Sequence, residues 1–297
     1  MWQNLSLNTR VIWLLITLLA VIDAVGLKAE GIWLAPHVIM LPKILFITVL
    51  VVLSAIGAGF RRGVSMAEAM HMTAAILAFS FTTSILGYLS VGWQRPLVDS
   101  YLAAADHALG LDWIAYYKWV ISYPLIHQTL YVAYYTLIVQ VTLLPFVLNF
   151  MGRTGRGWEM LWLFMVSCIA GILFAGIWPA VGAFGYYHVE TGNPYVHVFM
   201  ALHDGSLKII GNNPLQGVIQ FPSFHVALAI IFVYAARGMR FLFPLLLVTN
   251  ALLFIATPVI GGHHFADLWA GVVLALVTIL VVRKTPLSRN FAPVGVS

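Results

Sequence analysis

Two short motifs near the C-terminus place histidine, serine and aspartate at spacings that suit nucleophilic and acid–base chemistry. The first is Pro222-Ser223-Phe224-His225, and the second runs from His263 to Asp267. Residues four apart on a helix share a face, so the Asp267 carboxylate can accept a hydrogen bond from one ring nitrogen of His263. This contact fixes the tautomer and leaves the other nitrogen a lone pair for attack. The second motif therefore predicts a nucleophilic histidine and the carboxylate that orients it.

The first motif offers the groups that such a nucleophile needs around it. Proline suits the first position of a helix, so we expect Pro222 to begin a helix whose unpaired N–H groups, with the Ser223 hydroxyl, bind phosphate oxygens. His225 can protonate a departing alkoxide, or deprotonate an incoming water or alcohol. We also expect His263 in the first turn of its own helix, where the helix dipole disfavours the imidazolium and attracts an anion. Together the motifs predict phosphoryl transfer through a phosphohistidine.

Other uses of these residues remain open. A histidine and an aspartate four apart often form only a structural hydrogen bond. His264 is either a neighbour that packs nearby or, three residues before Asp267, a replacement for His263. A metal or proton transporter could use His225, His263, His264 and Asp267 as one coordinating cluster, since imidazole and carboxylate suit zinc. Against this alternative, the sequence shows no broken-helix repeat of the transporter kind. A catalytically inactive scaffold or lipid-binding protein is the third alternative.

Both motifs resemble signatures of a known family. They are similar to the second and third signatures of the type 2 phosphatidic acid phosphatase superfamily, with Phe224 in place of the glycine of Pro-Ser-Gly-His. Phe221, Phe224, the double histidine and the Gly-Leu-Asp-Trp run at 110–113 are more similar to the inositol phosphorylceramide synthase-like branch. The resemblance covers roughly the C-terminal half of the chain, with weaker similarity from about Arg95.

The resemblance implies a membrane-embedded enzyme that transfers phosphoryl groups of lipid phosphates or phosphodiesters. His263 would be the nucleophile, Asp267 its orienting residue and His225 the general acid and base, with no metal and no other cofactor. Water as the second nucleophile would make the enzyme a lipid phosphatase, whereas a lipid or polyol hydroxyl would make it a phosphotransferase of the inositol phosphorylceramide synthase kind. We place hydrolysis slightly ahead. The expected partners are a lipid phosphate or phospholipid substrate and membrane lipids, without nucleic acid, and the oligomeric state stays open.

Two cationic positions of the superfamily carry other residues in this chain. The superfamily usually has an arginine six residues before the nucleophilic histidine, where this chain has Thr257. It also has a lysine seven residues before Arg-Pro, and the residue seven before Arg95 is Tyr88. Neutralisation of the phosphate charge must then come from elsewhere. Topology places Arg95 and Lys208 best for this role, so we expect both, with Ser223, to bind phosphate.

The composition assigns these motifs to a membrane protein. Of the 297 residues 62% are hydrophobic and 8% are charged, whereas about a quarter of a soluble domain is charged. Several apolar runs reach the roughly 20 residues that a helix needs to cross the bilayer. We therefore expect an all-α polytopic membrane helix bundle of about eight transmembrane helices, with the superfamily's helical core in the C-terminal part. The expected spans are residues 11–27, 36–60, 70–92, 123–150, 158–182, 222–236, 241–260 and 263–282.

A single integral membrane domain, residues 1–297, is the expected organisation. It comprises N-terminal helices at 10–92, an outer interfacial segment at 93–122 and a catalytic helical core at 123–283, which includes an outer loop at 186–221. The first apolar run leads into a second long run rather than into a cleavage site, so we interpret it as a retained helix. The two loop segments are too polar to cross the membrane and long enough to fold over one face.

The placement of basic residues predicts the orientation in the membrane. With the N-terminus in the cytoplasm, the inner connections are rich in arginine, whereas the outer ones mix few basic residues with acidic ones. Both termini are then cytoplasmic and both motifs lie at the non-cytoplasmic face, in what we expect to be a bacterial inner membrane. The net charge of +5 reflects this topology and attraction to anionic lipid. The inner basic residues are Arg10, Arg61, Arg62, Arg153, Arg156, Arg237, Arg240, Arg283, Lys284 and Arg289.

Overall fold

Most of the described residues are helical in the computed structural model, which describes residues 7–35, 40–57, 64–190, 194–210 and 217–285. The helices at the expected spans are α1 (Leu7–Glu30), α2 (Met40–Gly57), α3 (Val64–Val91), α6 (Pro124–Phe150), α7 (Thr154–Ile177), α10 (Phe224–Ala235), α11 (Leu242–Ile260) and α12 (Phe265–Lys284). The others are α4 (Asp99–Ala108), α5 (Trp113–Ser122), α8 (Gly182–Tyr186) and α9 (Tyr195–His203). Two short strands, β1 (Trp33–Leu34) and β2 (Ile209–Ile210), pair in parallel.

Each expected span overlaps a helix, because a bilayer leaves an apolar segment few other ways to satisfy its backbone, and residues 36–39 and 58–60 of the second span lie outside the described residues. The chain is an integral membrane protein, and its all-α bundle confirms the fold class predicted from the sequence. Among the described residues, six helices rather than about eight are long and apolar enough to cross a membrane. They are Asn8–Glu30, Met66–Val91, Pro124–Phe150, Thr154–Tyr186, Leu242–Ile260 and Phe265–Lys284. The apolar segments Ile44–Gly57 and Phe224–Ala235 are shorter.

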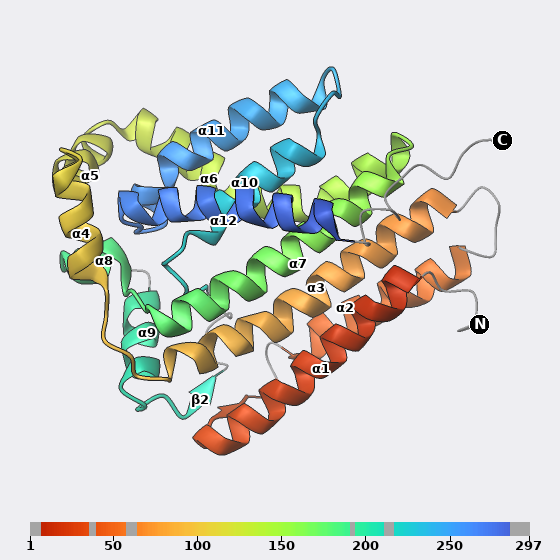
Figure 1. Ribbon diagram of the computed structural model, residues 1–297, viewed down its shortest axis with the longest axis horizontal. Coiled ribbons are helices and arrows are strands. Elements are labelled where there is room, and N and C mark those ends of the chain that lie inside the picture. Colours follow the sequence, from red (N-terminus) through yellow and green to blue (C-terminus); the bar gives the residue numbers. More distant parts are fainter. Residues whose placement is uncertain (1–6, 36–39, 58–63, 191–193, 211–216, 286–297) are drawn as a thin grey trace.

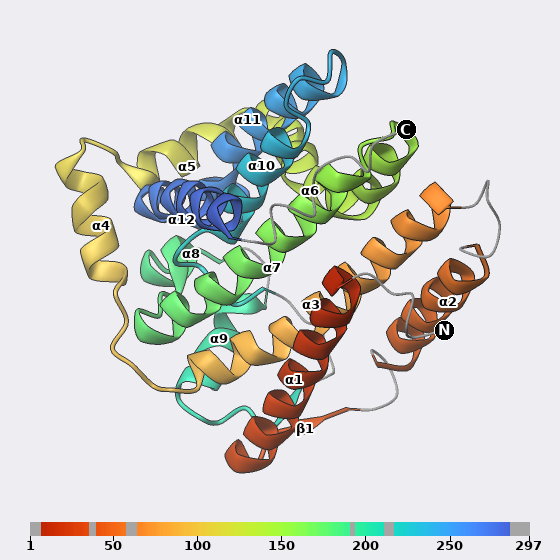
Figure 2. The same cartoon turned by 45° about the vertical axis from the view of Figure 1, so that its right-hand side comes forward.

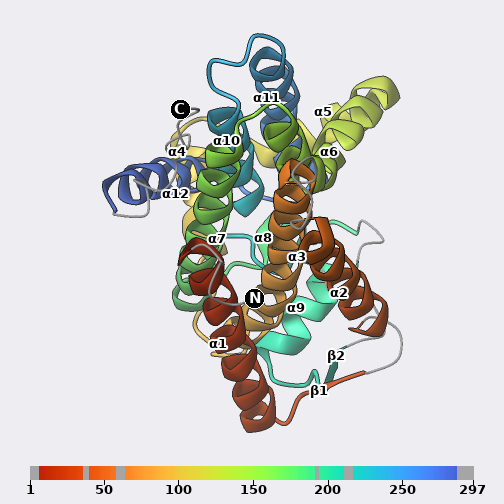
Figure 3. The same cartoon turned by 90° about the vertical axis from the view of Figure 1, so that its right-hand side faces the viewer.

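Helices α3 and α7 form the centre of the bundle. Helices α1 and α2 lie on one side of them, and α6, α10, α11 and α12 lie on the other (Figures 1 and 3). Helix α7 is apolar on nearly every face and is buried along most of its length, the pattern of a helix surrounded by other helices. Phe79 of α3 meets Phe164 of α7 edge to face at 5.8 Å. The peripheral helices expose leucine, valine and isoleucine, which suits contact with lipid.

The two ends of the bundle differ. Helices α4, α5, α8 and α9, here called the end layer, gather where α3 and α7 end and α12 begins (Figures 1 and 2). Strand β2 pairs with β1 through Trp33 and Ile209, which ties the end of α1 to the same region. Helix α1 begins and α12 ends at the opposite end (Figure 1). The end layer therefore lies over the end of the bundle that carries both sequence motifs.

Candidate active site

His263 and Asp267 form the hydrogen bond that their spacing predicts. Nδ1 of His263 lies 3.3 Å from Oδ2 of Asp267, and both side chains are almost wholly buried. When Asp267 is ionised its carboxylate only accepts hydrogen bonds, so this contact favours the tautomer with the proton on Nδ1 and the lone pair on Nε2. Burial lowers the pKa of His263 to about 3. The ring is therefore neutral near pH 7, as a nucleophile must be, and the pair is a hydrogen bond rather than an ion pair.

The helix that carries Asp267 begins later than the sequence predicts. Helix α12 starts at Phe265, so His263 lies two residues before it rather than in its first turn. Gly262 has a φ of +70°, a left-handed conformation that favours glycine, and it turns the chain between α11 and α12. The His264 N–H donates to Oδ2 of Asp267 at 2.8 Å, the same oxygen that faces His263. A carboxylate in the first helical turn reaches back to the preceding residues, so the expected contact forms without a helical His263.

His225 faces His263, as expected for two motifs that begin neighbouring helices. Their ring centroids are 6.1 Å apart. The rings pack edge to face at this separation, so the two imidazoles lie side by side at one site. The approach of α10 to α12 depends on Gly271, since a Cβ there would lie 2.4 Å from the Ser223 carbonyl oxygen. The Ser223 N–H also donates to the carbonyl oxygen of Asp267 at 3.0 Å.

The start of the first motif also differs from the prediction. Helix α10 begins at Phe224, with Ser223 as the residue before it, so Pro222 is not at the first helical position. The physical reason is that Ser223 has an extended backbone and donates its N–H to a carbonyl oxygen of α12. That N–H is therefore not free for phosphate. The Ser223 hydroxyl is fully buried and has no hydrogen-bond partner among the described residues, so it stays a candidate for binding phosphate.

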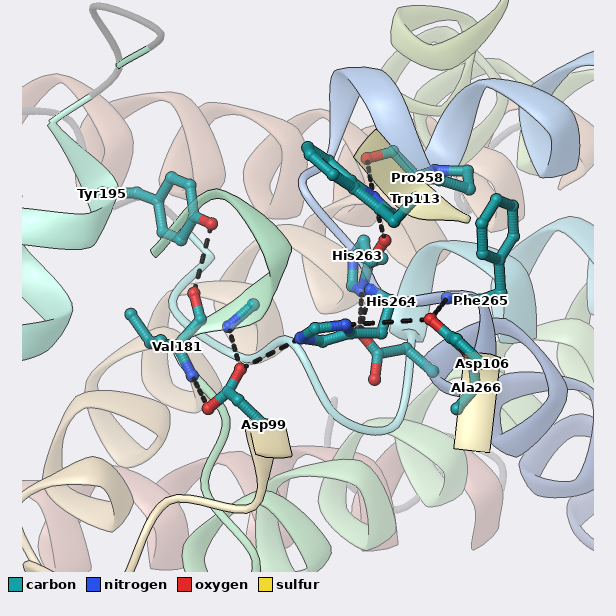
Figure 4. A network of polar contacts seen from close by, with 12 residues as sticks. Asp99, Asp106, Trp113, Val181, Tyr195, Pro258, His263, His264, Phe265 and Ala266 are labelled. Atoms are coloured by element: carbon teal, nitrogen blue, oxygen red, sulfur yellow. Dashed lines mark hydrogen bonds and ion pairs between the residues drawn. The ribbon is translucent and has the colours of Figure 1, made fainter. Parts of the chain in front are cut away.

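Asp106 of α4 caps the start of α12 from another helix (Figure 4). Its two carboxylate oxygens accept the N–H groups of Phe265 and Ala266, at 2.9 and 2.7 Å. The first N–H groups of a helix have no partner inside it, and the helix dipole further stabilises an anion there. Burial raises the pKa of Asp106, and the two N–H groups oppose this effect. Helix α4 therefore helps to determine where α12 begins.

Asp99 and His264 continue this network. Oδ1 of Asp99 lies 3.3 Å from Nε2 of His264, and the same carboxylate accepts the N–H groups of Val181 and Gly182 at 2.9 and 2.8 Å. Nδ1 of His264 lies 3.8 Å from Oδ2 of Asp106, the other aspartate of α4. The His264 ring is thus held between two carboxylates of α4 (Figure 4). The ring that contacts His225 is that of His263.

The roles of Asp99 and Asp106 are not evident from the two motifs, but one pattern in the sequence points to them. The two aspartates are seven residues apart, which places them on the same face of α4. Leu102 and Ala103 share that face, and all four residues are buried. Carboxylates that repeat with apolar residues along one helical face indicate paired acidic groups rather than solvated ones, because an unpaired buried charge is costly.

Trp113 of α5 holds the backbone on the other side of the nucleophile. Its Nε1 donates to the carbonyl oxygens of His263 and Pro258, at 3.0 and 3.2 Å. The indole is 1% exposed and stacks on the rings of Tyr117 and Tyr187. The Gly-Leu-Asp-Trp run therefore supports the position of the His263 main chain, a role that the sequence motif alone does not reveal.

The expected cations have other recorded partners. Lys208 donates to the carbonyl oxygen of Glu30 at the end of α1, at 3.3 Å. Arg95 is exposed, and its carbonyl oxygen accepts from Nε2 of His203 at 2.8 Å. Thr257, at the superfamily's arginine position, is fully buried and donates to a carbonyl of its own helix. In the ranges that the structure describes, no hydrogen bond or ion pair joins either cation to the two facing histidines.

The transporter alternative would use these side chains as a coordinating cluster. Within the described part of the chain, no group of three or more histidine, cysteine, aspartate or glutamate residues is arranged to hold a metal ion. The side chains of His263 and His264 contact the carboxylates of Asp267 and Asp99, and His263 also forms a hydrogen bond with the backbone of Gln220.

Comparison with known proteins gives one family match. A family model described as the PAP2 superfamily matches residues 100–281, which is more than half of the chain. The matched region begins within α4 and includes both motifs, Asp106 and Trp113, whereas Asp99 lies one residue before it. Neither the curated proteins nor the solved structures give a match to the chain.

Proposed function

The chain belongs to the PAP2 superfamily, and we propose that it is a membrane-embedded phosphoryl-transfer enzyme acting on lipid phosphates or phosphodiesters through a phosphohistidine intermediate. Membership of this superfamily indicates an enzyme that acts on phosphoric esters as a phosphatase or phosphotransferase. The observation that carries the finer proposal is the pair of facing rings, with neutral His263 oriented by Asp267 and its centroid 6.1 Å from that of His225. This arrangement offers a nucleophile and a proton carrier for one phosphoryl group.

In the first step, Nε2 of His263 attacks phosphorus. The new N–P bond forms as the bond from phosphorus to the leaving oxygen breaks, and that oxygen takes a proton from the protonated ring of His225. An anionic phosphate beside His225 favours this protonated form. Positive charge develops on the His263 ring during attack, and the carboxylate of Asp267, at 3.3 Å from Nδ1, stabilises it.

The second step returns both histidines to their starting states. A water or alcohol molecule gives a proton to neutral His225 as its oxygen attacks the phosphohistidine. The N–P bond breaks, and its electron pair returns to Nε2 of His263. When the substrate is a phosphate monoester, water releases inorganic phosphate from the phosphohistidine. An alcohol instead receives the phosphoryl group, or the phospho-head group when the substrate is a diester.

Hydrolysis is our first choice for the second step, and phosphotransfer is the alternative. His225 is less buried than His263, and this supports a role for water, because the ring that accepts the proton lies nearer to solvent. The side chain of His263, by contrast, is 2% exposed. Enclosure of the intermediate favours a bound acceptor over bulk water, and this supports transfer to a lipid or polyol hydroxyl.

We extend the proposal to the whole chain as one integral membrane domain, with both termini in the cytoplasm and the active site on the non-cytoplasmic side of a bacterial inner membrane. The positive-inside pattern supports this orientation. Single cysteines at exposed Leu109, near the end layer, and at exposed Phe241, between α10 and α11, test it in a chain whose Cys168 is replaced by alanine. A membrane-impermeant thiol reagent added to whole cells should label position 109 and not 241, and the reverse would refute the orientation.

The function is tested by following the phosphoryl group. Purified protein in lipid nanodiscs receives a radiolabelled lipid phosphate or phospholipid, with and without candidate alcohols. We expect acid-labile, alkali-stable label on the protein, followed by labelled inorganic phosphate or a labelled alcohol ester. The product that dominates distinguishes hydrolysis from transfer.

Histidine variants show whether the label depends on the proposed site. His263→Ala should abolish protein labelling and turnover, whereas His225→Ala should slow both steps. His197→Ala, which changes an exposed histidine of α9, is the matched control and should behave as wild type. Equal behaviour of wild type and His263→Ala on every substrate would refute the mechanism.

A further inference from the structure

A tyrosine of α6 contacts the proton-carrying histidine and belongs to neither motif. The rings of Tyr134 and His225 are stacked, with centroids 4.6 Å apart and planes at 20°. Two other tyrosines of the same helix, Tyr131 and Tyr135, are exposed. Of these three, Tyr134 is the one whose ring lies against His225.

The hydroxyl of Tyr134 also reaches the reactive side of the nucleophile. A Cβ placed on Gly261 would lie 2.8 Å from this hydroxyl oxygen and 2.9 Å from Cδ2 of His263. Both atoms therefore lie close to the backbone of Gly261, which can approach them because residue 261 has no side chain. Cδ2 is bonded to Nε2, the ring nitrogen that does not face Asp267. The phenol group thus lies near the edge of His263 from which attack on phosphorus would occur.

Within the described residues, Tyr134 makes ring contacts with Tyr135 and His225, and neither of these is a hydrogen bond. A tyrosine hydroxyl in a protein interior usually has a partner. The Ser223 hydroxyl, close in sequence to His225, is fully buried and also has no partner among the described residues. The Tyr134 hydroxyl at the facing histidines, and the Ser223 hydroxyl two residues before His225, are therefore candidate donors to the oxygens of a ligand.

The proposed site needs hydrogen-bond donors to the phosphate oxygens. Phosphoryl transfer is accelerated by preorganised donors or cations at the oxygens where negative charge develops. The threonine at the superfamily's arginine position, Thr257, donates to the Leu253 carbonyl at 2.7 Å and is fully buried. Arg95 and Lys208, in the described ranges, have no hydrogen bond or ion pair with the facing histidines.

We propose that Tyr134 is a further catalytic residue, whose hydroxyl donates a hydrogen bond to a non-bridging oxygen of the phosphoryl group held between His225 and His263. Its neutral phenol group supplies part of the stabilisation of the phosphoryl oxygens that an arginine gives elsewhere in the superfamily. Its ring also holds the His225 imidazole in place by stacking. The proposal rests on the proposed phosphoryl-transfer function.

The test uses Tyr134→Phe in the full-length protein, because phenylalanine keeps the ring that stacks on His225 and removes only the hydroxyl. We expect kcat to fall about 100-fold with little change in KM, since the lost hydrogen bond acts mainly on the transition state. Inhibition by vanadate, which mimics the five-coordinate phosphorus, should weaken by a similar factor. Tyr134→Leu, which also removes the stacked ring, should lose more activity.

Tyr135→Phe is the matched control, because it removes the hydroxyl of the exposed neighbour on the same helix. It should retain the kcat and the vanadate affinity of wild type, and all variants should keep the wild-type thermal unfolding temperature within a few degrees. A Tyr134→Phe enzyme with kcat and vanadate inhibition within twofold of wild type would overturn the proposal, provided that wild type transfers phosphate and His263→Ala does not. An inactive wild type, or an active His263→Ala, would instead overturn the proposed function itself.

Discussion

Removal of the Asp106 carboxylate should destabilise the protein and reduce its activity together. The two oxygens of this side chain accept the N–H groups of Phe265 and Ala266, at 2.9 and 2.7 Å, in a place where the aspartate is 1% exposed. Asp106→Ala leaves both N–H groups without their acceptor at the start of α12. His263 lies two residues before that start, so the turn that carries the nucleophile loses its anchor on α4.

The magnitude follows from the number of groups left unpaired. A buried donor without an acceptor costs about 1–3 kcal/mol, so two of them cost about 2–6 kcal/mol of the free energy of unfolding. Asp106→Asn keeps one acceptor oxygen and loses the charge, so its cost should be intermediate. Asp112 provides the comparison, because it caps α5 by accepting a single N–H, that of Ala115 at 2.9 Å, in exposed surroundings. Asp112→Ala should cost about 0.5–2 kcal/mol.

The assay combines thermal unfolding in detergent with single-turnover phosphorylation of the protein by a labelled lipid phosphate. We expect Asp106→Ala to lower the unfolding temperature more than Asp112→Ala does and to slow phosphorylation at temperatures where it remains folded. Asp112→Ala should leave the rate unchanged. A stability loss no larger than that of Asp112→Ala, or a full rate in folded Asp106→Ala, would show that α4 does not hold the turn.

Three other outcomes test the site. Burial lowers the pKa of His263 to about 3, against 6.5 for the free side chain, so the unfolded state binds more protons between these two pH values. The free energy of unfolding should therefore fall as pH drops from 6.5, and it should fall less steeply in His263→Gln. Equal slopes for the two proteins in unfolding scans would contradict this. Gly271→Ala should push α10 from α12 and reduce kcat, since its Cβ would lie 2.4 Å from the Ser223 carbonyl oxygen, whereas Gly171→Ala, with its nearest neighbour at 3.6 Å, should be tolerated. Asp267→Asn should reduce kcat about 10²- to 10⁴-fold through loss of ring orientation and charge stabilisation, and an unchanged kcat would make the pair purely structural.

Local patterns in the sequence were enough to predict the membrane helices and the meeting of the two motifs. An apolar run in a bilayer must satisfy its own backbone hydrogen bonds, so hydropathy alone predicts a helix at each span. The contact of His263 with Asp267 depends on residues four apart, and the facing of His225 and His263 follows from two motifs at the same end of adjacent helices. The positions of helix starts were predicted less well, because Pro222 and His263 both lie before their helices.

What only the tertiary structure decided is the set of groups around the two histidines. Asp106 bonds to residues about 160 positions away in the chain, and Tyr134 stacks on a histidine of another helix. No periodicity or spacing encodes such contacts, because they depend on how helices pack against each other. The sequence determined the chemical types of the central residues, since these reside in short motifs. The donors, carboxylates and aromatic rings that fix their geometry come from segments that meet only when the bundle is folded.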